Sequence, residues 1–103
     1  MMELKIMEPA EFAAADLSLF TVVDMREEGV PPSLRIPGAV EIPFSRWFSE
    51  ADSIPKEKPV LLLCQIGKCS ELAGETMADR GYDVSSLRGG FAAYYALKKK
   101  TGR

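Results

Sequence analysis

Two cysteines, Cys64 and Cys69, lie five positions apart in a short segment, and they are the residues of this sequence best suited to chemistry. The apolar run Val60-Leu61-Leu62-Leu63 precedes Cys64, and a helical pattern follows the segment. A short apolar run of this kind is typical of a strand that is buried on both faces of a parallel sheet. Cys64 is therefore predicted at the carboxyl end of a buried strand, facing a helix N-terminus, where open α/β sheets bind their ligands.

The predicted loop between this strand and the helix favours a reactive sulfur. A loop that curls over a helix N-terminus turns backbone N–H groups inward, and the helix dipole adds partial positive charge, so that a thiolate at the centre is stabilised. Gly67 allows an unusual backbone conformation, Lys68 adds a positive charge, and Ser70 is expected to help cap the helix. The alternative is that Cys64 is an inert, small apolar residue that ends the strand.

The composition predicts one compact domain over residues 1–103, with 47% hydrophobic and 27% charged residues. A net charge of −2 gives no bulk electrostatic case for binding nucleic acid. No apolar run approaches the ~20 residues that cross a membrane. The N-terminal segment carries acidic residues early and has no signal-peptide pattern, so a cytoplasmic protein without nucleic-acid or membrane partners is expected.

The absence of histidine restricts the kind of site that this sequence can form. It excludes a Cys–His catalytic pair, a Ser–His–Asp triad and every zinc site that uses histidine. Two cysteines are too few for a structural zinc site within one chain. Because both lie in one loop, they indicate chemistry or metal binding more than a disulfide scaffold. No resident metal or cofactor is expected.

Strand-like and helix-like segments alternate along the chain. Strands are predicted at residues 3–7, 20–23, 40–42, 60–63 and 82–87, and helices at 8–15, 43–48, 70–80 and 91–100. This alternation predicts a layered α/β domain with a mainly parallel sheet. Asp24 and Cys64 both follow strands and are expected to point into one crevice.

Several details of the helices and loops can also be predicted. Residues 27–35 contain glycine and prolines and are expected to form an irregular loop, and Gly81 is expected to end the helix over 70–80. Trp47 and Phe48 are expected in the core. One side of the helix over 70–80 is expected to carry four residues: Leu72, Ala73, Thr76 and Met77.

Four segments in this order give the chain a family resemblance. They are Val22-Val23-Asp24-Met25-Arg26, the stretch from Ile36-Pro37-Gly38-Ala39 to Pro43, the stretch from Val60 to Ser70, and Leu87-Arg88-Gly89-Gly90-Phe91. The chain resembles the single-domain rhodanese-like sulfurtransferases. The resemblance implies a three-layer α/β/α domain with a five-stranded parallel sheet. It also implies that Cys64 takes a sulfane sulfur from a donor, thiosulfate or a persulfide, and passes it on from a persulfide.

The same resemblance implies roles for the residues around Cys64. Asp24 would brace the active loop by hydrogen bonds and Arg26 would pair with an acid; the alternative is an ordinary ion pair without a chemical role. The acceptor would be a thiol, either a small molecule or a thioredoxin-like or sulfur-relay protein. The substrate-binding loop would comprise Gln65, Ile66, Gly67, Lys68, Cys69 and Ser70.

The loop departs from the family pattern, which commonly runs Cys-Arg-Ser-Gly-x-Arg. Gln65 and Cys69 stand where arginines are usual. Arginine binds an oxyanion with a planar fork that Lys68 cannot reproduce, so weaker use of thiosulfate is expected than in a typical member, and a persulfide of a thiol becomes a better candidate donor. Arg35 replaces a histidine and is expected to restore positive charge near the site.

Cys69 is the departure with the clearest chemical consequence. It could act as a resolving thiol that attacks an oxidised or persulfidated Cys64, or it could only fill the start of the helix. The competing function is a non-catalytic binding or redox-sensing module that uses Cys64 and Cys69. A cysteine-dependent phosphatase or arsenate reductase would need a loop that ends in arginine, and this loop has none.

Overall fold

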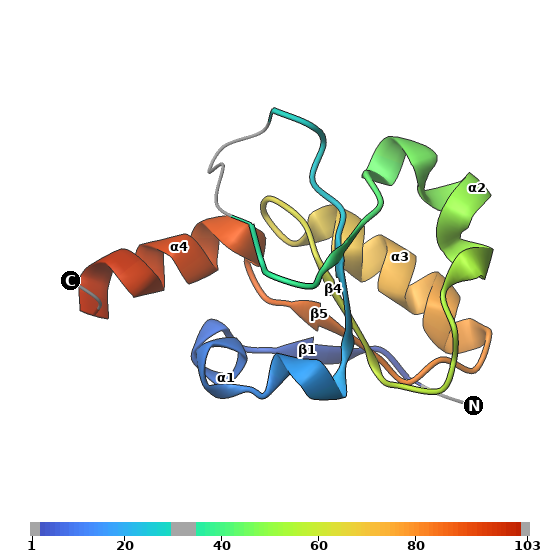
Figure 1. The fold of residues 1–103 in the computed structure, drawn as a ribbon, viewed down its shortest axis with the longest axis horizontal. Coiled ribbons are helices and arrows are strands. Elements are labelled where there is room, and N and C mark those ends of the chain that lie inside the picture. Colours follow the sequence, from blue (N-terminus) through green and yellow to red (C-terminus); the bar gives the residue numbers. More distant parts are fainter. Residues whose placement is uncertain (1–2, 30–34, 102–103) are drawn as a thin grey trace.

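The computed structural model describes residues 3–29 and 35–101 of the chain (Figure 1). The strands are β1 (Lys5–Met7), β2 (Thr21–Asp24), β3 (Val40–Glu41), β4 (Val60–Leu63) and β5 (Val84–Leu87). The helices are α1 (Pro9–Ala14), α2 (Trp47–Glu50), α3 (Lys68–Asp79) and α4 (Gly90–Thr101). Short 3₁₀ segments cover Leu17–Leu19, Phe44–Arg46 and Ala51–Ser53.

The strands form one parallel sheet in the order β1-β5-β4-β2-β3, which confirms the predicted five-stranded parallel sheet. β4 lies at its centre, as its four fully buried residues require. In the register between β2 and β4, Asp24 pairs with Leu63, the residue before Cys64. The ends of these two strands therefore bring residues 24–26 and the cysteine loop to the same edge of the sheet.

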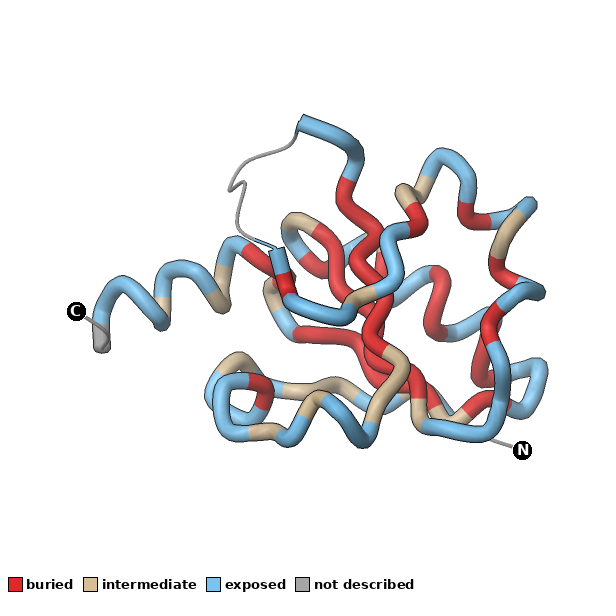
Figure 2. The backbone as a smooth tube through the Cα atoms, viewed as in Figure 1, coloured by how far each residue is buried: buried red, intermediate tan, exposed pale blue. Residues whose placement is uncertain are grey.

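The side chains of β4 alternate between two separate hydrophobic cores, one on each face of the sheet. Val60 and Leu62 pack with residues of α2 and α3, and Leu61 and Leu63 pack with Phe12 of α1 and Phe91 of α4. Figure 2 shows the buried strands running through the middle of the molecule between exposed helix faces. The three-layer α/β/α architecture is confirmed. Cys64 continues the alternation and belongs to the core beneath α2 and α3.

Two expectations about buried side chains are wrong. Trp47 is buried as expected, but Phe48 is 72% exposed and packs edge-on against Phe44. On α3, Leu72 and Thr76 are exposed, because the buried stripe is rotated by one position from the predicted one. The residues of this stripe are Ser70, Ala73, Gly74, Met77 and Ala78. Gly74 packs closely against Leu4: a Cβ at this position would lie 2.5 Å from Cδ1 of Leu4, so the Leu4 side chain would have to move.

The helix ends and loops agree with the sequence in most places. Gly81, with φ +89°, follows the end of α3 and accounts for the stop at this point. Of the loop expected over residues 27–35, residues 30–34 lie outside the described residues. No helix in the described part of the chain is both long and apolar enough to span a membrane.

Candidate active site

The sulfur of Cys64 lies at the end of β4, directly against the first turn of α3. The side chain is 4% exposed. The backbone N–H groups of Gly67 and Ser70 point at Sγ, with N···S distances of 3.1 and 3.4 Å. Both amides favour a negatively charged sulfur, and the positive end of the α3 dipole adds to their effect. Amides are therefore turned toward Cys64, as the sequence predicted.

α3 begins two residues earlier than expected, and this shift explains why its amides reach the sulfur. Gly67 is the residue before the helix and adopts φ +96°, a left-handed conformation that suits glycine. Ser70 consequently lies within the first turn, where backbone N–H groups have no partner inside the helix. Its N–H binds Cys64, and its hydroxyl donates to the Gly67 carbonyl instead of capping the helix. The expected cap at Ser70 is therefore wrong.

A second serine, which the sequence analysis did not identify, completes the surroundings of the sulfur. Ser86 of β5 is fully buried, and its hydroxyl lies 2.7 Å from the hydroxyl of Ser70. The Ser70 hydroxyl is in turn 3.5 Å from Cys64 Sγ, which donates to it as a thiol. When the sulfur is ionised, Ser86 can donate to Ser70 while Ser70 donates to the thiolate. The two adjacent serines, Ser85 and Ser86, in the predicted last strand were the available signal.

The Ser86→Ala variant tests this hydroxyl pair. Without the Ser86 proton donor, alkylation of Cys64 at neutral pH is expected to slow by about 2- to 10-fold, because one hydrogen bond contributes about 0.5–1.5 kcal/mol. Mass spectrometry of the Cys64 peptide after a timed dose of iodoacetamide measures the rate. Ser85→Ala is the matched control, since Ser85 faces the other side of β5. Equal rates in both variants would remove the Ser86 hydroxyl from the site.

The start of α4 holds the other side of the cysteine loop. The amide of Phe91 donates to the Cys64 carbonyl at 2.7 Å, and the amide of Ala92 donates to the Gln65 carbonyl at 2.9 Å. Gly90, with φ +67°, lets the two segments approach so closely. The free amides of this helix N-terminus are thus used to fix the loop backbone.

Asp24 and Arg26 form a buried ion pair behind the loop. Nη2 of Arg26 lies 2.8 Å from Oδ2 of Asp24, and the amide of Arg26 donates to Oδ1 at 3.0 Å. The guanidinium also lies over the ring of Phe91, with Cζ 3.7 Å from its centroid. The predicted pairing of Arg26 with an acid is present. Within the described residues, however, the side-chain hydrogen bonds of Asp24 go to Arg26. Asp24 therefore supports the loop indirectly: Arg26 packs on Phe91, whose amide binds the Cys64 carbonyl.

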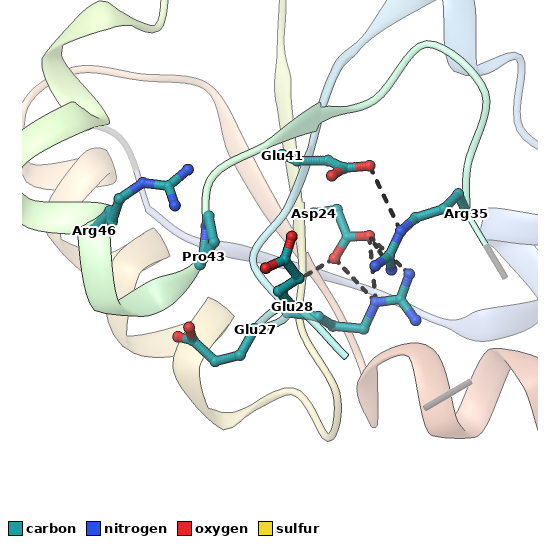
Figure 3. A pocket seen from close by; sticks show the side chains of 8 residues that line it. Asp24, Glu27, Glu28, Arg35, Glu41, Pro43 and Arg46 are labelled. Atoms are coloured by element: carbon teal, nitrogen blue, oxygen red, sulfur yellow. Dashed lines mark hydrogen bonds and ion pairs between the residues drawn. The ribbon is translucent and has the colours of Figure 1, made fainter. Parts of the chain in front are cut away.

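Arg35 does not supply free positive charge beside Cys64. Its guanidinium pairs with Asp24 at 3.7 Å and with Glu41 at 3.6 Å. These residues line a pocket of about 350 Å³ together with Glu27, Glu28, Arg46 and others (Figure 3). In this pocket carboxylates alternate with the arginines and neutralise them. Asp24 and Arg35 line this pocket, whereas Cys64 lines a second pocket that shares Arg26 and Glu27 with it.

Cys64 lines a different pocket of about 170 Å³. Its walls are mainly apolar: Met25, Phe44, Ile66 and Cys69 contribute, and Arg26 and Glu27 separate it from the charged pocket. Gln65 also lines it, and within the described part of the chain Oε1 of Gln65 is buried without a hydrogen-bond partner. Cys64 therefore borders a small, mainly apolar pocket.

Cys69 lies half-buried in the first turn of α3, beside Cys64. Burial raises the pKa of the Cys69 thiol above its ordinary value, and the Cys64 side chain and then Glu27 raise it further. Both cysteines are free thiols. Among residues 3–29 and 35–101, no cluster of three or more potential metal ligands occurs.

Comparisons with known proteins identify the family and the fold. The family model for the rhodanese-like domain matches residues 8–97. A tRNA sulfurtransferase of Desulfurococcus amylolyticus is 31% identical over 80 residues, which are 78% of this chain but 16% of that relative. The thiosulfate sulfurtransferase GlpE of Coxiella burnetii is 28% identical over 73% of this chain and 71% of its own length.

The fold matches solved structures equally well. A rhodanese-related protein of Thermoplasma volcanium superposes with a TM-score of 0.78 at 22% identity, over 90% of this chain and 92% of that one. The family model, the relatives and the solved structures indicate the same family. The four ordered motifs of the sequence agree with it. The chain belongs to the rhodanese-like domain family.

Proposed function

We propose that the chain is a sulfurtransferase that carries a sulfane sulfur as a persulfide on Cys64. The observation that carries the proposal is the environment of Sγ: two amide donors at 3.1 and 3.4 Å, the N-terminus of α3, and an apolar pocket beside the sulfur. Amides and helix dipole favour the thiolate that must attack the donor. The relatives whose names include sulfurtransferase support the same reaction class.

The chemistry of the pocket favours a persulfide of an organic thiol over thiosulfate as the donor. Thiosulfate is a dianion whose oxygens only accept hydrogen bonds. Arg26, the one cation among the described lining residues, is neutralised by Asp24, and Glu27 adds a negative charge. The buried side-chain oxygen Oε1 of Gln65 has no hydrogen-bond partner among the described residues; thiosulfate has no donor for it, whereas a persulfide S–H or a peptide N–H does.

Sulfur uptake from two donors tests this function. The chain is mixed with glutathione persulfide or with thiosulfate and quenched with an alkylating reagent during the first turnover. Trypsin cuts after Lys68 and places Cys64 and Cys69 on separate peptides, residues 57–68 and 69–80. The added sulfur is expected on the Cys64 peptide, about 10- to 100-fold faster from glutathione persulfide, because each missing charge-assisted hydrogen bond is worth about 1.5–3 kcal/mol.

The Gln65→Arg variant shows whether loop charge sets the donor preference. It is expected to speed uptake from thiosulfate by about 10-fold or more, since arginine supplies the missing bidentate contact. Leu19→Arg is the matched control: it adds the same charge at an exposed position outside the site. If both variants speed uptake from thiosulfate equally, the effect comes from net charge and not from an arginine in the loop. Absence of sulfur on Cys64 with either donor would overturn the function.

The pair of free thiols keeps a second function open, a redox-sensing module without turnover. Cys64 and Cys69 line one pocket, so oxidation of both could report on the redox state. This function predicts that neither donor leaves sulfur on Cys64, while a thiol oxidant such as diamide readily oxidises the two cysteines to a disulfide. The uptake experiment therefore separates the two functions.

A further inference from the structure

Two thiols, Cys64 and Cys69, share the wall of one small pocket. Cys64 is almost completely buried, and Cys69 is half-buried and packs against the cluster that contains Cys64. The backbone amides of Gly67 and Ser70 bind Cys64 Sγ, and Cys69 lies between these two residues in the sequence. The sulfur of Cys64 therefore lies over the backbone turn that carries the second thiol.

This placement has a consequence for a persulfide on Cys64, and the inference rests on the proposed function. We propose that Cys69 resolves the Cys64 persulfide within the chain. The Cys69 thiolate attacks Sγ of the protonated persulfide (Sγ–SH) on Cys64, a disulfide bond forms between the two cysteines, and the bond to the outer sulfur, which keeps its proton, breaks. The outer sulfur leaves as hydrosulfide. It is reduced from the sulfane to the sulfide level, and the two cysteine sulfurs are oxidised to the disulfide, so no external oxidant is needed. A dithiol reductant then restores both thiols.

The electrostatics of the pocket set when this step occurs. Among the described residues, the charged or titratable groups that line this pocket with Cys69 are Cys64 after β4 and Arg26 and Glu27 after β2. Burial first, and then Cys64 and Glu27, raise the pKa of the Cys69 thiol, so near neutral pH it is mostly protonated. A protonated Cys69 leaves the persulfide intact for an external acceptor. Internal release of sulfide should accelerate as the pH rises and Cys69 ionises.

The test uses the full chain with one equivalent of glutathione persulfide, without added reductant or oxygen. The wild-type chain is expected to release sulfide, to become two hydrogens lighter than the dithiol form, and to yield the peptides 57–68 and 69–80 joined by a disulfide. The Cys69→Ser chain is expected to release no sulfide and to carry one extra sulfur on the Cys64 peptide. The rate of sulfide release from the wild-type chain is expected to increase from neutral to alkaline pH.

Each other outcome has a defined meaning. A wild-type chain that keeps the sulfur on Cys64 at alkaline pH, with no linked peptides, would overturn the inference and leave the proposed function standing. A Cys69→Ser chain that carries the mass of glutathione instead of one sulfur would show that the disulfide arises from a mixed disulfide, and would also overturn it. Failure of both chains to take up sulfur or release sulfide would overturn the proposed function and with it the inference.

Discussion

The Cys64→Ser variant is expected to lose sulfur transfer, with the rate to a thiol acceptor falling by about 10³-fold or more, to the rate without protein. Serine fits the same space, so the amides of Gly67 and Ser70 keep a hydrogen-bond acceptor. A serine hydroxyl is not ionised near neutral pH and forms no persulfide, so only the nucleophile is removed. Sulfide production from glutathione persulfide with excess dithiol, corrected for the reaction without protein, measures the loss.

Thermal unfolding supplies the control for this variant. The transition temperature is expected to stay close to that of the wild type, which separates lost chemistry from lost structure. Residual transfer that disappears in the Cys64→Ser/Cys69→Ser chain would show that Cys69 accepts sulfur directly from the donor. Transfer at the wild-type rate in that double variant would contradict a cysteine mechanism altogether.

The sequence predicts the sheet and its two covering layers well, because the relevant signals are local. The run Val60–Leu63 is apolar at every position, as a strand covered on both faces must be, and each of the five strands was located to within a few residues. The start of α3 was less predictable. A glycine before a helix can be a cap or part of a turn, and only the folded loop shows that Gly67 takes the former role and places Ser70 within the first turn.

The site was predictable where it depends on chain order and was not where it depends on pairing between distant segments. Cys64 and its loop are contiguous, so their shape follows from a strand, a glycine and a helix start. Ser86 reaches the hydroxyl of Ser70, which contacts the sulfur, only because β5 pairs with β4, and no local pattern specifies this pairing. The ion pairs of Arg35 with Asp24 and Glu41 were missed because they depend on how Arg35 is placed against β2 and β3 in the fold.

The glycine at position 90 carries the strongest steric constraint on the cysteine loop. A Cβ on Gly90 would lie against the Cys64 carbonyl oxygen and 2.7 Å from the carbonyl carbon and oxygen of Gln65. These are backbone atoms that the amides of Phe91 and Ala92 hold in place by hydrogen bonds, so moving them would cost free energy. The Gly90→Ala variant must therefore either break these hydrogen bonds or move the start of α4 away from the loop.

The expected result for Gly90→Ala is a loss of about 2–5 kcal/mol in the free energy of unfolding, together with slower sulfur uptake on Cys64. About 1–2 kcal/mol comes from the left-handed backbone and about 1–3 from the overlap. Gly38→Ala is the matched control, because Gly38 has φ +82° and nothing within 4 Å of the added methyl group. Denaturant unfolding and timed uptake compare the two variants. Equal destabilisation with normal uptake in both variants would show that contact between α4 and the loop does not shape the sulfur site. A larger loss of stability together with slower sulfur uptake in Gly90→Ala alone would show that the position of α4 sets the reactivity of Cys64.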